Sequence, residues 1–152
     1  MALGDIVTFH VVVLTSAFHY AALHSTTLCH TLDLLRLKQE AIASITRAMK
    51  SVPADCIVND HLIAAVAKMA SYEAMYGERA LYHTHMTALQ KMVHLRGGLE
   101  SLGLGGLLAR MVLWIDTNSA FLLNEGFYFQ SSTFPIRQPL APPNPGCFLG
   151  IS

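Results

Sequence analysis

The side chains that could do chemistry in this sequence are eight histidines, three cysteines and ten carboxylates. His83 and His85 lie two positions apart, which on a helix puts them on nearly opposite faces, so they cannot chelate one metal ion together. Cys29, Cys56 and Cys147 are scattered singly, and no HExxH or CxxC motif occurs. We therefore expect no metal site and no cofactor, although spacing alone leaves open a site assembled from distant histidines.

Acid–base catalysis has few candidates. The acids nearest to the most informative stretch, residues 83–116, are Glu73, Glu78, Glu100 and Asp116. With His85 they would form an acid–base pair if a cleft brought them together. The competing interpretation is that Glu73, His85, Arg96 and Asp116 pair and hydrogen-bond between helices, because polar groups on apolar helical faces must be satisfied. No serine stands in a GxSxG context. We favour the second interpretation and expect no catalytic residue.

Residues 83–116 are organised as two amphipathic helices around a glycine-rich corner. Their apolar residues recur at helical spacing: Met86, Leu89, Met92 and Val93, then Leu107, Leu108, Met111, Val112 and Ile115. Gly97 follows a helical run that ends at Arg96, where a left-handed residue closes the last turn. Gly98 then lets the chain reverse without a Cβ penalty. The glycines match neither GxGxxG nor GxxxxGK[ST], so they predict a turn and not a phosphate-binding loop.

The chain before this unit predicts three more helices. Residues 6–23 are almost continuously apolar, and we expect a buried first helix there. A membrane span is disfavoured by the polar residues inside the run and a signal peptide by Asp5 before it. Residues 28–50 predict a long helix that buries the stripe Leu28, Leu32, Leu35, Ile42, Ile45 and Met49. Pro53 cannot continue a helix, so we expect a linker there. Asp60 is expected to cap a third helix and Gly77 to end it.

Composition fits one all-α domain. We expect five or six packed antiparallel helices in residues 1–124 and an irregular Pro/Gly-rich tail, a poor place to look for chemistry, in residues 125–152. Hydrophobic residues make up 53% and charged residues 13%, with a mean hydropathy of +0.41. Such apolar content predicts a surface that meets a protein partner or a second copy. Ten basic residues balance ten acidic ones, so the charge excess that drives nucleic-acid binding is missing.

The signature His85-Met86, Leu89, Met92-Val93, Leu95 to Leu99 (LRGGL) and Trp114-Ile115-Asp116 resembles that of the fungal-specific transcription factor domain. That domain is the helical regulatory region found downstream of a six-cysteine zinc cluster in fungal regulators. The resemblance covers about residues 5 to 124, and the zinc cluster has no counterpart among the three cysteines. It implies that seven residues form a structural signature: Glu73, His85, Arg96, Gly97, Gly98, Trp114 and Asp116.

The resemblance implies a regulatory domain that does not bind DNA directly, lies in the nucleus or cytoplasm, and acts through protein contacts or a small hydrophobic effector. We expect no membrane attachment. Two alternatives stay open. One is a small isomerase-like or cyclase-like enzyme on the same scaffold, which a deep pocket with converging histidine and carboxylate would indicate. The other is a homo-oligomerisation module, whose sign would be exposed apolar stripes on the first and last helices.

Overall fold

The computed structural model describes residues 3–24, 28–51, 58–129, 142–144 and 146. Its elements are α1 (Leu3–His24), α2 (Leu28–Ser51), α3 (Asp60–Tyr76), α4 (Arg79–Leu95), the 3₁₀ turns η1 (Leu99–Ser101) and η2 (Leu104–Gly106), and α5 (Leu107–Leu123). Within these ranges every regular element is helical. The predicted all-α single domain is confirmed.

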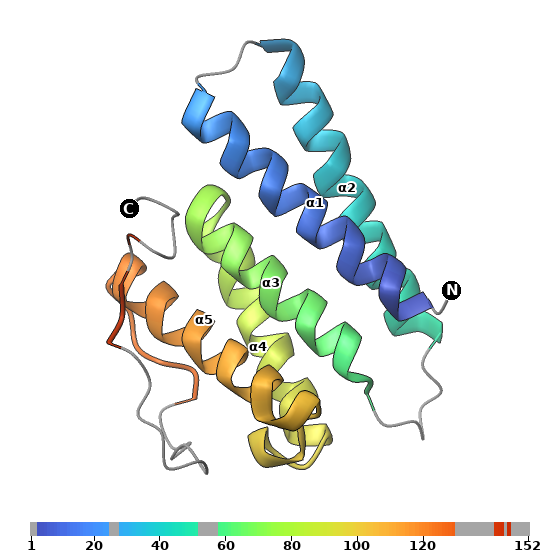
Figure 1. The fold of residues 1–152 in the computed structure, drawn as a ribbon, viewed down its shortest axis with the longest axis vertical. Helices are drawn as coiled ribbons and strands as arrows, with labels where there is room; N and C mark the ends of the chain where they lie inside the picture. Colours follow the sequence, from blue (N-terminus) through green and yellow to red (C-terminus); the bar gives the residue numbers. More distant parts are fainter. Residues whose placement is uncertain (1–2, 25–27, 52–57, 130–141, 145, 147–152) are drawn as a thin grey trace.

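Helix α3 is the centre of the molecule (Figure 1). Helices α1 and α2 form an antiparallel hairpin that packs on α3 mainly through α1, while α4 and α5 pack on other sides of α3. Alanines such as Ala65, Ala67 and Ala70 are fully buried in α3. Small side chains let neighbouring helices approach closely, which is why one helix can contact all four others.

The expectation that the first helix is buried is wrong. One stripe of α1, which includes Val7, Val11 and Leu14, is buried against its neighbours. The opposite side is a continuous surface that we call the α1 face: Ile6, Phe9, Val12, Ser16, Tyr20 and Leu23, all of them exposed. Among the described elements, α2 and α3 are the ones that cover α1 substantially. An apolar sequence does not show how many neighbours a helix has, so periodicity could not reveal this edge position.

The predicted stripe of α2 is also largely wrong. Leu35, Ile42 and Met49 are 55%, 39% and 49% exposed, and of the predicted residues with described side chains only Ile45 is buried. Ala41 and Ser44 are buried beside Ile45 instead, because small residues let α1 lie close to the α2 backbone. The side chains of Leu28 and Leu32 lie outside the described residues.

The ends of the helices follow local chemistry. The Asn59 side chain, and not that of Asp60 as predicted, caps α3 by accepting a hydrogen bond from Leu62 N at 2.8 Å. Gly77 ends α3 as predicted. Gly97 and Gly98 have φ values of 98° and 99°, where glycine avoids the strain of a side chain. The predicted linker at Pro53 lies outside the described residues.

Candidate functional site

Glu73 ties three helices together. Its carboxylate is buried, and its Oε1 lies 2.9 Å from Lys38 Nζ of α2, whose side chain is 18% exposed. Its Oε2 accepts a hydrogen bond at 2.9 Å from the backbone N–H of Glu78, the residue that precedes α4. Lys38 also lies 5.3 Å from the centre of the Tyr72 ring, within reach of a cation–π contact. The Glu73 side chain therefore joins α2, α3 and the start of α4.

Gly77 leaves the space in which the Glu73 carboxylate lies. A Cβ atom at Gly77 would come within 1.7 Å of Glu73 Oε2 and within 2.9 Å of Glu73 Cα. Only a residue without a side chain fits next to the Glu73 carboxylate in the turn between α3 and α4. Gly77 thus has a role beyond ending the helix: it permits the ion pair with Lys38.

His85 of α4 faces the same cluster. Burial lowers the pKa of His85, the nearby Lys38 lowers it further, and Glu73 opposes both effects. The folded protein therefore favours the neutral imidazole. Because the Glu73 carboxylate is already bound to Lys38 and to the Glu78 amide, the arrangement holds helices together and does not present a free base to solvent.

This shift predicts how stability depends on pH. A histidine with a lowered folded pKa contributes stability that is complete above its unfolded pKa, near 6.5, and is lost as the pH falls below that value. We expect the free energy of unfolding of His85→Gln to fall less steeply between pH 7 and pH 5 than that of the wild type. Urea denaturation of the two proteins at a series of pH values measures the difference. Identical slopes for the wild type and His85→Gln would contradict the prediction.

Arg96 and Asp60 hold the glycine corner. Arg96 Nη2 lies 2.9 Å from Asp60 Oδ1, and Arg96 Nη1 donates to Val58 O at 3.1 Å, so the end of α4 is fixed to the start of α3. Gly103 lies next to the same carboxylate, and a Cβ atom at this position would come within 2.0 Å of Asp60 Oδ2. Ser101 Oγ donates to the carbonyls of Arg96 and Gly98. The corner is thus a packed structure and not an open loop.

Asp116 of α5 binds the chain that follows its own helix. Its two carboxylate oxygens accept hydrogen bonds from Tyr128 N and Phe129 N, each at 3.0 Å. Burial raises the Asp116 pKa, and the two amides partly offset that rise. Trp114, from the same signature, is half-buried against the core. Asn118, also buried, accepts a hydrogen bond from Asn144 N at 2.9 Å. Parts of the predicted tail are therefore attached to α5.

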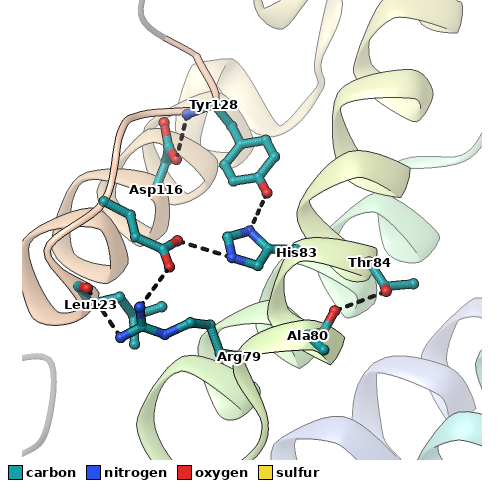
Figure 2. A network of polar contacts seen from close by, with 8 residues as sticks. Arg79, Ala80, His83, Thr84, Asp116, Leu123 and Tyr128 are labelled. Atoms are coloured by element: carbon teal, nitrogen blue, oxygen red, sulfur yellow. Dashed lines mark hydrogen bonds and ion pairs between the residues drawn. The ribbon is translucent and has the colours of Figure 1, made fainter.

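A second polar network, which the sequence did not indicate, lies between α4 and residues 125–128 (Figure 2). His83 Nδ1 is 2.6 Å from Tyr128 Oη, and His83 Nε2 is 3.2 Å from Glu125 Oε2. Arg79 contacts Glu125 Oε1 at 3.2 Å and Leu123 O at 3.3 Å. A depression of about 430 Å³ opens beside it, lined by His83, Gln90 and residues 125–128.

The signature residues do not converge on one pocket. Glu73 and His85 lie at the junction of α2, α3 and α4, Arg96 lies with Gly97 and Gly98 at the glycine corner, and Asp116 binds the segment after α5. Within the described part of the chain, no group of three or more histidine, cysteine or acidic residues is placed to hold a metal ion. Cys56 and Cys147 lie outside the described residues, as does the side chain of Cys29. The arrangement suits a helical scaffold whose junctions are fixed by buried charges.

The family model that matches this chain is that of the fungal specific transcription factor domain, over residues 1–141. This match extends past residue 124, where the sequence resemblance was expected to end. No curated protein and no solved structure matches the chain. The match covers most of the 152 residues, and the helical fold with its braced corners agrees with a scaffold of that kind. The chain belongs to the family of the fungal specific transcription factor domain.

Proposed function

We propose that this regulatory helical domain acts through protein contacts and that its α1 face docks against the α1 face of a second copy. Family membership supports a regulatory role. The observation that carries the choice of surface is the exposure of large apolar side chains along one side of α1: Phe9 is 62%, Val12 46%, Tyr20 63% and Leu23 58% exposed. Contiguous apolar surface of this kind is typical of an interaction site.

The charge pattern of α1 favours a second copy as the occupant. Residues 6–23 contain no Asp, Glu, Lys or Arg. Two such faces can therefore meet in a two-fold interface without burying an unpaired charge or opposing like charges. Tyr20, whose ring stacks edge-on with His24 at 4.3 Å, provides an amphipathic side chain of the kind enriched at interfaces.

The other exposed apolar residues are less suited to self-association. The exposed surface of α2 carries the apolar stripe of Leu35, Ile42 and Met49 together with charged residues such as Arg36 and Arg47. The last helix exposes Leu107 and Phe121 near its two ends, with Arg110 exposed between them. Of the two helices expected to signal oligomerisation, only α1 presents a continuous apolar face.

We further propose that the protein is nuclear and affects transcription through the proteins it binds. Its ten basic and ten acidic residues leave no net charge to attract a phosphate backbone. The domain therefore affects transcription by binding other proteins and not by binding DNA itself.

A charged substitution in the α1 face tests the proposal. We expect light scattering to give a dimer mass for the wild type and a monomer mass for Phe9→Lys/Val12→Lys, with dimer affinity weakened at least about 100-fold, because the lysines would be buried without partners. Gln39→Lys, at an exposed position on α2, adds the same charge outside the face and should leave the dimer intact. A monomeric wild type, or equal masses for all three proteins, would contradict the proposal.

A membrane is the competing occupant of the same face. Two segments are long and apolar enough to cross a bilayer by length and composition, Ile6–His24 and Leu104–Leu123, and these are 22% and 50% buried in the structure. The core helix of a soluble protein meets the same criterion. Co-flotation of the wild type with phosphatidylcholine/phosphatidylserine vesicles, lost in Phe9→Lys/Val12→Lys, would assign the face to lipid and overturn protein docking.

A further inference from the structure

Helices α4 and α5 share a neighbour but make few direct contacts with each other. Both pack on α3. The seam between them is bridged by residues 125–129, which we call the strap, after α5 ends at Leu123 and Asn124 turns the chain in the left-handed region with φ 54°. The strap runs back toward Asp116, the residue that binds it, so it lies along α5 beside α4 (Figure 2). The strap thus fills the seam that the packing of α4 and α5 on α3 leaves between these two helices.

The backbone of the strap is recognised directly. Asp116 accepts hydrogen bonds from the N–H groups of Tyr128 and Phe129, and Gln90 Nε2 of α4 donates to the carbonyl of Tyr128. One side chain from each helix therefore holds the main chain of two consecutive residues. Recognition of this kind accepts any extended peptide, as in other modes of peptide binding.

Side chains of α4 add specificity. Tyr128 places its hydroxyl 2.6 Å from His83 Nδ1, and its ring meets the buried Tyr82 ring edge-on, with centroids 6.1 Å apart. Glu125 contacts both Arg79 and His83 at 3.2 Å. Arg79, Gln90, His83, Tyr82 and Asp116 together form what we call the seat. Its chemistry selects an acidic residue followed at a short distance by an aromatic one.

The side chains of the strap are only partly buried, as those of a bound peptide are, whereas a core helix buries one side completely. Phe127 is 49% exposed, Tyr128 and Phe129 are only partly buried, and the Arg79 side chain that contacts Glu125 is 61% exposed. The Glu125 side chain is 18% exposed, so solvent reaches this ion pair from the Arg79 side and screens it. The depression lined by His83 and Gln90 leaves further space next to the strap.

We propose that the seat is a peptide-binding site for an extended acidic–glycine–aromatic segment of a partner protein, and that the chain's own strap is its built-in competitor. While the strap is in place, a partner segment must displace it. A tethered segment acts at an effective concentration in the millimolar range. The strap therefore sets a threshold that only an abundant or closely tethered partner segment exceeds. The seat and the α1 face share no residue, so this proposal stands apart from dimerisation.

Peptide binding to full-length variants tests the proposal. The probe is a fluorescent peptide with the sequence of residues 124–129, Asn-Glu-Gly-Phe-Tyr-Phe, followed by anisotropy. We expect Glu125→Ala/Tyr128→Ala, which weakens the strap and leaves the seat intact, to bind the peptide at least ten times more tightly than the wild type. Adding Asp116→Asn should weaken that binding about tenfold, because an amide offers one acceptor and one donor to two N–H groups. Adding Asp33→Asn, at an exposed position of α2, should not.

Four outcomes overturn the proposal. The first is equal peptide affinity in the wild type and the strap variant. The second is no binding by a strap variant that has the wild-type circular dichroism spectrum. The third is binding that Asp116→Asn leaves unchanged. The fourth is loss of the helical spectrum in the strap variant itself, which would make the strap an inseparable part of the core. Phe9→Lys/Val12→Lys should bind the peptide as the wild type does, so failure of the α1 interface and failure of the seat can be told apart.

Discussion

Gly77→Ala is expected to destabilise the domain by about 3 kcal/mol or more, the cost of breaking a buried ion pair. The new Cβ would lie 1.7 Å from Glu73 Oε2. The carboxylate could move away only by leaving Lys38 and the Glu78 amide, and the Cβ would still lie 2.9 Å from the Glu73 Cα. Thermal and urea unfolding of the variant measure the loss.

Two comparisons isolate the cause of this loss. Gly105, unlike Gly77, has open space where a Cβ would lie and has a φ of +60°. Gly105→Ala should therefore cost only about 1 kcal/mol, from left-handed strain. In a Glu73→Ala background, Gly77→Ala should cost much less than in the wild type, because the carboxylate atoms nearest to the new Cβ are gone and only the contact with the Cα of residue 73 remains. A full cost of Gly77→Ala in both backgrounds would show that the Glu73 carboxylate is not what the glycine accommodates.

Lys38→Met is expected to cost about 3 kcal/mol at pH 7, because it leaves the Glu73 carboxylate buried without its countercharge. Methionine keeps most of the length and the apolar stem of lysine, so the change tests charge more than packing. The loss should appear in urea denaturation. Because Lys38 is on α2 and Glu73 on α3, amide hydrogen exchange should also increase in α2 more than in α5.

An exposed ion pair on the same helix is the matched control. Arg36 contacts Glu40 at 3.3 Å with side chains 79% and 46% exposed, and such pairs contribute at most about 0.5 kcal/mol. Arg36→Met should therefore change stability little. Equal costs for Lys38→Met and Arg36→Met would contradict the assignment of the Lys38–Glu73 ion pair as a contact that stabilises the packing of α2 on α3.

Local rules predicted the helices and the turns. The prediction located α2 to within a residue and placed α4 and α5 on either side of the glycine corner, although α5 continues to Leu123, past the predicted stretch that ends at residue 116. Gly77, Gly97 and Gly98 ended helices or turned the chain as their lack of a Cβ indicates. These features depend on residues close together in sequence, where spacing determines geometry.

Partners distant in sequence could not be predicted in this way. Lys38 is 35 positions from Glu73, and Asp60 is 36 from Arg96. Spacing within one helix says nothing about which residue of another helix meets it. The interhelical role expected for Glu73 and Arg96 agrees with their contacts, but Asp116 binds the segment after its own helix. The sequence named neither Lys38 nor Asp60 as a partner.

The sequence also could not show which side of an apolar helix is covered. In α2 it predicted burial of the stripe that includes Leu35 and Ile42, and the structure exposes these two residues and buries the small residues Ala41 and Ser44. In α1 it indicated burial where one side is open. The strap was missed because residues 125–129 follow no helical or strand period, and because its contacts to α4 join residues distant in sequence, such as His83 and Tyr128.

Site-specific photo-crosslinking tests the central claim, protein docking through the α1 face, most directly. A benzoylphenylalanine would replace Ser16, which is exposed at the centre of the face, or Gln39, which is exposed on α2. The account predicts a covalent dimer on irradiation of the Ser16 derivative and none from the Gln39 derivative, because two-fold related faces bring Ser16 of one chain close to the other. No dimer from Ser16, or equal yields from both positions, would contradict it.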